Sequence, residues 1–270
     1  MSRIVTSKHG DLYGLDAQGR LLTHKSLISG RHGSQIYHPS PDIVSWTDDF
    51  TGGSQAFSTT IIDGWRSRKG SDGACVDWTV TPAVNGTCVG TIGSTTASMA
   101  VSGVQLDRGL SYKANQGNVA FEARVALSQI TTIAVFVGFT DQTAALEMPI
   151  QSAASANTLT TNATDAVGFM FDTSMTTDDW WLVGVATDVD ATHQDTTFAP
   201  VAATFETLRV ELSAAGVATF YRNGKQVGTS MSGAVTATVA LTPVIAGFNR
   251  TTSAAPTITA DYVHVASNRV

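Results

Sequence analysis

The sequence has few charged side chains for its length. Charged residues make up 14% of its 270 residues, whereas an average soluble domain carries about 25%. The only glutamates are Glu122, Glu147, Glu206 and Glu211, and lysine is almost as rare. Because both residues favour exposed helix surfaces, their scarcity argues against a helical protein. Threonine, glycine and serine are abundant instead, and they suit strands and turns.

Segments that enter membranes or direct secretion are also missing. No apolar run approaches the ~20 residues needed to span a bilayer, and the N-terminal sequence lacks the apolar core of a secretory signal. Cysteine is limited to Cys75 and Cys88. Their spacing suits a disulfide across a hairpin, and two buried free thiols are the alternative. We expect a chain made in the cytoplasm, without membrane insertion, that is later exposed outside the cell.

Common catalytic and metal-binding motifs are absent from the sequence. It has no Gly-x-Ser-x-Gly elbow, no His-Glu-x-x-His pair, no Cys-x-x-Cys cluster and no phosphate-cradling glycine loop. Asp188, Asp190 and Asp195 could offer oxygen atoms to Ca²⁺, but they lack EF-hand spacing, and we interpret them as an acidic solvated loop. We therefore expect no cofactor, no metal and no nucleic-acid partner.

Charge is unevenly divided between the N-terminal segment and the rest of the chain. Residues 1–38 carry five basic and two acidic residues, a balance of +3, whereas the remainder carries 11 basic and 20 acidic residues, a balance of −9. Pro39 and Pro41 suit an extended linker. We predict an arm over residues 1–41 and one domain over residues 42–270. A solvated N-terminal extension is the alternative interpretation of the arm.

Apolar residues in the arm indicate a partner rather than an idle tail. Residues 12–23 read as a short hairpin with a turn in its middle. In a contact with another copy or with a particle surface, basic groups would orient the arm and apolar groups would provide most of the affinity. The basic residues predicted to bind the partner are Arg3, Lys8, Arg20, Lys25 and Arg31.

Hydrophobic patterning predicts an all-β domain. Residues 119–127 and 206–212 alternate between apolar and polar positions, as half-buried strands do. Residues 133–139, 166–171 and 181–187 are apolar at nearly every position and read as central strands covered on both faces. Asn223-Gly224 predicts a two-residue hairpin turn, because a type I′ turn needs positive φ at both central residues. Many short strands separated by turn residues favour a sandwich or barrel.

Three segments resemble the concanavalin A-like lectin/glucanase superfamily, which includes laminin G-like modules. WTDDFTGG at 46–53 is similar to the opening strand, FYRNGKQVG at 220–228 to the late hairpin, and ADYVHV at 260–265 to the final strand. The resemblance implies a two-sheet antiparallel jelly-roll sandwich over residues 42–270. Residues 137–141 and 162–173 also resemble structural proteins of tailed phages.

The resemblance includes glucanases, so a catalytic pair of carboxylates has to be considered. Such enzymes carry Glu-x-Asp-x-x-Glu or a close variant, and their carboxylates lie about 5–9 Å apart. The sequence contains no such motif. Glu206 and Glu211 stand five residues apart, so on one strand they would face opposite sides of the sheet. We therefore predict no catalytic residues and no enzymatic activity.

A lectin-like role rests on the loop before residue 182. Asp178, Asp179 and Trp180 could bind a glycan, with the aromatic ring as a platform and the carboxylates as hydroxyl acceptors. Adjacent residues face opposite sides of a strand, so Trp180 and Trp181 cannot share one layer, and core packing is the alternative for both.

These observations favour a non-enzymatic structural protein of a tailed-phage virion, such as a capsid decoration, head fibre or tail-associated protein. Its N-terminal arm would anchor it to other virion proteins, and the chain would form homo-oligomers. One alternative is a carbohydrate-binding module that contacts host surface glycans, and another is a degraded or atypical glycan hydrolase.

Overall fold

The computed structural model describes residues 43–269, except 63, 83, 96–97, 154–156 and 253–254, and the backbone of three strands nearer the N-terminus. These three strands are β1 (Arg3–Thr6), β2 (Leu12–Leu15) and β3 (Leu21–Leu22). They form an antiparallel sheet of their own in the order β1-β2-β3, called the arm sheet below. β2 and β3 pair as the hairpin predicted within residues 12–23.

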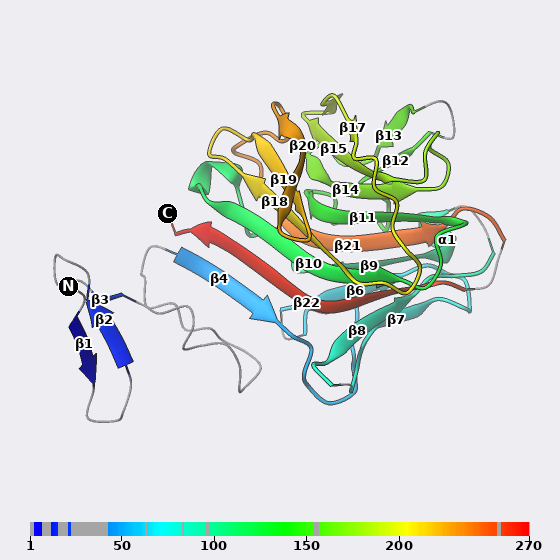
Figure 1. The fold of residues 1–270 in the computed structure, drawn as a ribbon. Helices are drawn as coiled ribbons and strands as arrows, with labels where there is room; N and C mark the ends of the chain where they lie inside the picture. Colours follow the sequence, from blue (N-terminus) through cyan, green and yellow to red (C-terminus); the bar gives the residue numbers. More distant parts are fainter. Residues whose placement is uncertain are drawn as a thin grey trace.

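The rest of the described chain forms two antiparallel sheets packed face to face (Figure 1). The nine-stranded sheet runs β20-β19-β18-β10-β22-β8-β7-β5, with β4 also paired to β22. Its strands are β4 (Ile43–Asp48), β5 (Gln55–Ala56), β7 (Val76–Thr81), β8 (Thr87–Thr91), β10 (Val119–Leu127), β18 (Glu206–Leu212), β19 (Ala218–Arg222), β20 (Lys225–Met231) and β22 (Thr257–Asn268).

The eight-stranded sheet runs β16-β15-β14-β11-β21-β9-β6, with β17 also paired to β15. Its strands are β6 (Arg66–Lys69), β9 (Gly103–Asp107), β11 (Ile133–Thr140), β14 (Ala166–Asp172), β15 (Trp180–Ala186), β16 (Val189–Asp190), β17 (Gln194–Asp195) and β21 (Thr242–Asn249). A small hairpin of β12 (Ile150–Ser152) and β13 (Leu159–Thr161) adds a fourth sheet, and the described helices are α1 (Met99–Ser102) and a 3-10 turn at Ala114–Gln116. The predicted fold class, an all-β two-sheet antiparallel jelly-roll sandwich, is confirmed.

Strand patterning places the core between the two sheets. In β10, Val119, Phe121 and Ala123 are buried and their neighbours are partly exposed, so the predicted alternation is confirmed. β11, β14 and β21 are buried at every position, which confirms the prediction of strands covered on both faces for residues 133–139 and 166–171. In β11, alternate residues enter two different clusters: Val135 joins the core between the sheets, and Phe136 joins a second core on the outer face.

The β19–β20 hairpin has the predicted turn. Asn223 has φ 50° and Gly224 has φ 76°, so both central residues adopt the positive φ that a type I′ turn requires. β18 also follows the prediction, because Glu206 is buried on the inner face and Glu211 is partly exposed on the outer face. Glu206 accepts a hydrogen bond of 2.6 Å from Trp180 Nε1 and forms an ion pair with Arg222.

The first and last strands of the sandwich are direct neighbours. β4 pairs antiparallel with β22, and the register joins Ile43 to Asn268 and Asp48 to Val263. Trp46 packs edge-on against Trp65 with ring centroids 5.0 Å apart, and Arg108 stacks over Trp46 at 3.5 Å. The strand that follows the arm is therefore fixed to the body by a ladder and by an aromatic cluster.

Candidate functional site

The outer face of the eight-stranded sheet is covered by the chain itself. The covering segment, called the cover below, consists of the described residues 141–153 and 157–163 and includes β12 and β13. Side chains of the cover and of α1 meet the outward residues of β11, β14, β15 and β21 in a second apolar core. This outer core contains Met99, Ala134, Phe136, Met148, Ile150, Ala163, Ala166, Met170, Met175, Trp181, Val183, Val185, Val244, Ala246 and Phe248.

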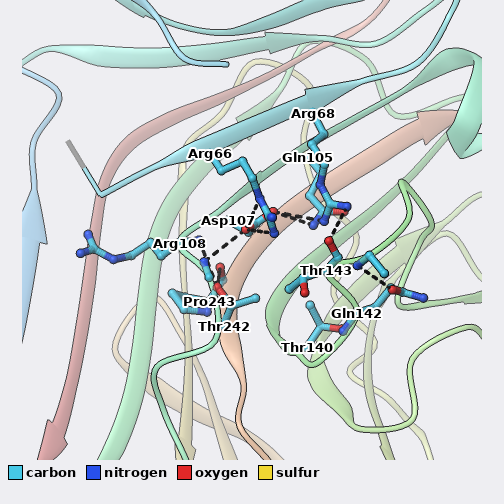
Figure 2. A network of polar contacts seen from close by, with 12 residues as sticks. Arg66, Arg68, Gln105, Asp107, Arg108, Thr140, Gln142, Thr143, Thr242 and Pro243 are labelled. Atoms are coloured by element: carbon cyan, nitrogen blue, oxygen red, sulfur yellow. Dashed lines mark hydrogen bonds and ion pairs between the residues drawn. The ribbon is translucent and has the colours of Figure 1, made fainter. Parts of the chain in front are cut away.

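A cluster around Asp107 fixes the start of the cover. Asp107 lies on β9, is fully buried, and accepts hydrogen bonds from Arg66 Nη2 at 2.7 Å and from Gln105 Nε2 at 2.9 Å. Arg68 Nη2 approaches the same carboxylate at 3.3 Å. Figure 2 shows the two arginines converging on Asp107. β6 and β9 place these groups together because Arg66 pairs with Asp107 and Arg68 with Gln105.

Arg68 links this cluster to the cover and is called the Arg68 staple. Its Nη1 donates to the carbonyl oxygens of Thr143 at 2.9 Å and Ala145 at 2.8 Å. Burial lowers the pKa of Arg68, and Asp107 opposes that shift. An arginine keeps its charge under such a shift. A buried carboxylate therefore holds a guanidinium, and the guanidinium holds the backbone of the cover.

A second arginine–aspartate pair fixes the hairpin of the cover and is called the Arg250 staple. Asp172 is the last residue of β14 and is fully buried. Its carboxylate accepts a hydrogen bond of 2.8 Å from Arg250 Nε and forms an ion pair with Arg250 Nη2. Both partners also bind Ser152: its N–H donates to Asp172 Oδ2 at 2.8 Å, and its carbonyl accepts from Arg250 Nη2 at 2.9 Å. β12 is thus attached through its backbone to the end of β14.

The two buried carboxylates of this face do not form a hydrolase-like pair. The register from β9 through β21 and β11 to β14 places Asp107 and Asp172 three strands and four residues apart. With about 4.8 Å between strands and about 3.4 Å per residue, that separation is roughly 20 Å. Each carboxylate is also paired with arginine. Their arrangement suits attachment of the cover.

The structure places the predicted glycan-binding residues in different environments. Trp180 is 1% exposed and packs against Phe169 and Phe171, so the expectation that its ring is a sugar platform is corrected. Asp178 is exposed, and Asp179 is half-buried. Burial raises the pKa of Asp179, and the nearby Asp195 adds to this.

Trp181 takes the opposite face of β15, as the sequence predicted for adjacent residues. It is 5% exposed, belongs to the outer core, and its ring contacts His193 at 5.5 Å between centroids. Both tryptophans are therefore core residues, one on each side of the strand.

Among the predicted arm residues, Arg3 begins β1. Lys8, Arg20, Lys25 and Arg31 lie outside the described residues.

The cysteines and the acidic loop also have defined places. Cys75 and Cys88 are free and buried, and burial raises the pKa of both thiols. Of the two alternatives, buried free thiols are therefore what the structure contains. In the residues that the structure describes, no group of three or more His, Cys, Asp and Glu side chains could hold a metal ion. No helix among those residues is long and apolar enough to cross a membrane.

The outer face of the nine-stranded sheet has a different character. Cross-strand register aligns Tyr221, Arg209, Glu122, His264 and Thr47 in one row over five strands, called the polar ladder below. Arg209 stacks over Tyr221 at 4.3 Å and lies 3.9 Å from Glu122, and Thr47 Oγ1 is 2.7 Å from His264 Nδ1. All five residues are partly exposed, so the polar ladder is in contact with water.

Sequence reasoning missed the cover and both staples. The signal available was indirect: Arg66 and Arg68 alternate on a short strand, and Asp172 ends an otherwise apolar one. Their partners Thr143, Ala145 and Ser152 are distant in sequence and contribute backbone atoms, which any residue type could supply.

Comparison with solved structures assigns the architecture. A prokaryotic β-1,3-1,4-glucanase (lichenase) from a mouse hindgut metagenome superposes with a TM-score of 0.53 and 10% identity, covering 82% of this chain and 98% of that one. The fold is the concanavalin A-like lectin/glucanase jelly roll. A structure described under endo-acting O-glycanases of the human gut microbiota matches with a TM-score of 0.52 and 7% identity, over 83% of this chain and 98% of that one. No family model matches the sequence, and no curated protein does.

The neighbours correct one prediction. The Crh5 transglycosylase matches the jelly roll with a TM-score of 0.51 and 13% identity, over 84% of this chain and 85% of that one. A lichenase and a transglycosylase therefore share this fold, so the prediction that the chain is not an enzyme is overturned. The concanavalin A-like jelly roll does not separate this chain from glycan-active proteins.

Proposed function

We propose that the chain is a structural protein of a tailed-phage virion. In this proposal residues 1–41 anchor it to the particle and residues 42–270 form the body. Its partners are other virion proteins and further copies of itself, and its location is the virion. The proposal is supported by the sequence segments that resemble phage structural proteins. It is also supported by the uneven charge, which is +3 over residues 1–38 and −9 over the rest.

The observation that carries the proposal is the position of the two ends of the sandwich. Ile43, which follows the arm, pairs directly with Asn268 near the C-terminus. An arm that continues from Ile43 therefore joins the sandwich at the edge formed by β4 beside β22 (Figure 1). This arrangement suits a module that is tethered at one end and projects from a surface.

The cover supports the same proposal. It fills the outer face of the eight-stranded sheet with the chain's own apolar side chains. With this outer face occupied, the body would provide stability and bulk. Attachment to the particle would then be made by the arm.

The experiment removes the arm and follows the protein into particles. Antiserum against residues 42–270 should detect the full chain in virions purified from cells that produce it. A chain lacking residues 1–41 should keep its strand-rich circular dichroism but be absent from the particles. The proposal fails if the truncated chain enters particles as the full chain does, or if no particle fraction contains the full chain.

A second candidate function is binding of a host glycan. Its support is the exposed carboxylate of Asp178 beside Asp179 and the hydroxyl of Thr177, which donates to Asp195 at 2.8 Å. Carboxylates of this kind accept hydrogen bonds from sugar hydroxyls. A glycan array tests it: a bound glycan should be lost in the Asp178→Ala, Asp179→Ala double variant. An array with no bound glycan, or one unaffected by the double variant, contradicts it.

A further inference from the structure

The edges of the sheets differ in how their backbone groups are satisfied. An edge strand carries unpaired N–H and C=O groups, which can pair with another strand. β5, β16 and β17 contain two residues each and offer little length for such pairing. The longer edge strands are β20, β6 and β4, and they differ in whether their outer backbone groups have hydrogen-bond partners.

The edge of β20 is blocked by a side chain. Gln194 donates through Nε2 to the carbonyl of Thr229 at 3.1 Å, and its Oε1 accepts from the Thr229 N–H at 2.8 Å. This amide occupies the positions that a neighbouring strand would use. β20 also has an irregular register with β19, and Gly228 in it has φ 62°. Bulges of this kind protect edges against strand addition.

The edge of β6 is also occupied in part, whereas that of β4 is open. Ser67 in β6 donates its N–H to the carbonyl of Ser58 at 2.8 Å. β4 pairs with β22 along all six of its residues, Ile43–Asp48. On its other side, no backbone hydrogen bond joins β4 to any part of the chain that the structure describes. Among the described residues, β4 is thus the longest edge strand whose outer side makes no backbone hydrogen bond.

Charge around this edge favours a basic strand. Asp48 ends β4 and Asp49 follows it, and burial, together with the charges of Asp48 and Asp261, raises the pKa of Asp49. The whole sequence after residue 38 has a balance of −9. Opposite charges on two surfaces steer and orient their association.

The arm sheet offers a strand with matching properties. β1 begins with Arg3 and forms one edge of the arm sheet, so a strand added there would leave the pairing of β1 with β2 in place. The three strands are short, and their sequences RIVT, LYGL and LL are mostly apolar. Small isolated sheets are marginally stable, so pairing with a further strand would stabilise the arm sheet.

We propose that the open edge of β4 receives β1 of a second copy of this chain, which extends the nine-stranded sheet by strand addition. The inference rests on the proposed role of the arm in assembly, and it assigns one contact of the arm, the contact with a neighbouring copy. Within one chain β1 and β4 belong to separate sheets, so a second copy supplies the missing strand. Because each copy has one arm and one edge, the contact is heterologous and links copies in a ring or a row.

Cysteine pairing between two singly substituted full chains tests the contact. One protein carries Ser45→Cys in β4, and the other carries Ile4→Cys or Val5→Cys in β1. The native Cys75 and Cys88 are free and buried, so they should not compete for the cross-link. Mixed disulfide-linked dimers should form with at least one of the β1 variants after mild oxidation. Ser230→Cys, placed on the blocked strand β20, is the matched control and should give no such dimers.

The other outcomes of this test overturn the proposal. Dimers formed by the Ser45→Cys protein alone would mean that β4 pairs with β4. A monomeric disulfide in the chain carrying both Ile4→Cys and Ser45→Cys, without mixed dimers, would mean that the arm docks on its own body. The absence of every cross-link, with all variants folded, would mean that the edge is not an assembly site.

Two proline variants provide an independent measurement. N–H groups of successive residues in an antiparallel strand point to alternate sides. Of Val44→Pro and Ser45→Pro, one therefore removes a bond to β22, and the other removes an outward N–H. The variant that retains the wild-type melting temperature should weaken self-association at least about tenfold, a loss that light scattering after size exclusion resolves. Unchanged association in that variant contradicts the proposal.

The two proposals can fail separately. If the arm-deleted chain is lost from particles but the edge-blocked proline variant is still incorporated and still self-associates, the virion function stands and the β4 edge is not the arm's partner. If the edge variants abolish self-association but particles never contain the protein, the pairing stands and the virion function fails.

Discussion

The outer faces of the two sheets differ in their exposure to water: one is covered by the chain and the other is not. On the eight-stranded sheet, Phe136, Met170 and Phe248 lie under the cover and are fully or almost fully buried. On the nine-stranded sheet, the polar ladder remains partly exposed, with Arg209 and Glu122 as its charged centre. Both faces belong to central antiparallel strands, so strand position alone does not explain the difference.

This difference shows that the alternation of apolar and polar residues along a strand determines whether its outer face must be covered. β10 and β18 alternate and leave one polar face that water can solvate. β11 and β14 are apolar on both sides, so their outer face must be removed from water. The absence of side chains at two glycines also allows close packing on these strands. Gly138 and Gly168 are paired across β11 and β14, and a Cβ on Gly168 would lie 2.9 Å from Phe136 Cζ.

The strongest test of the comparison truncates one aromatic residue on each face. Phe136→Ala should reduce the free energy of unfolding by about 3–5 kcal/mol, the range for a large buried side chain that leaves a cavity. Tyr221→Ala on the polar ladder should cost clearly less, because Tyr221 is partly exposed. Urea denaturation of both variants measures the difference. Equal losses would mean that the two faces are equally buried.

Removal of the Arg250 staple should have the next largest effect. Arg250→Met leaves the buried carboxylate of Asp172 without its cation, and breaking a buried pair in this way costs about 3 kcal/mol or more. Arg250→Lys is the control, since it keeps the charge but loses the two-point contact. Denaturation midpoints report the stability, and proteolysis within residues 141–163 reports the cover. An unaffected cover in Arg250→Met would show that the apolar contacts hold it alone.

The polar ladder should be far less sensitive. Glu122→Gln removes the ion pair with Arg209, whose side chain is 36% exposed, and exposed pairs contribute about 0.2–1 kcal/mol. The loss should shrink further in 1 M salt, where such pairs are screened. A loss comparable to that of Arg250→Met would mean that the open face is as tightly organised as the covered one.

The smallest effect concerns pH. Burial, aided by the hydrogen bond to Glu122, raises the pKa of Tyr262 to about 12, above its usual value of about 10. The unfolded chain releases this proton first as pH rises, so stability should fall between about pH 10 and pH 12. Tyr262→Phe should flatten that part of the stability profile measured by urea denaturation. An identical slope in the variant would mean that other groups cause the loss.

Much of the sandwich could be predicted because its determinants are local. Alternation at 119–127, doubly apolar runs at 133–139 and 166–171, and Asn223-Gly224 each depend on neighbouring residues only. The cover could not be predicted in this way. Its attachment depends on Arg68 and Arg250, whose partners lie about 75 and 98 residues away in sequence.

The glycan-binding prediction shows the same limit at a single residue. Two adjacent tryptophans must face opposite sides of a strand, which the sequence establishes. Whether the outer one is exposed depends on what covers that face, and here Trp181 lies in the outer core while Trp180 donates to Glu206.

Hydrogen exchange across the cover tests the central claim most directly, namely that the chain permanently seals one outer face. Amides of Ile150–Ser152 and Leu159–Thr161 should exchange about as slowly as those of Glu206–Leu212, because opening the cover would expose the apolar outer core to water. Mass spectrometry of peptides from both regions, under conditions where the protein is folded, gives the two rates. If the cover exchanges within seconds while Glu206–Leu212 stays protected, the face is open for much of the time and the account is wrong.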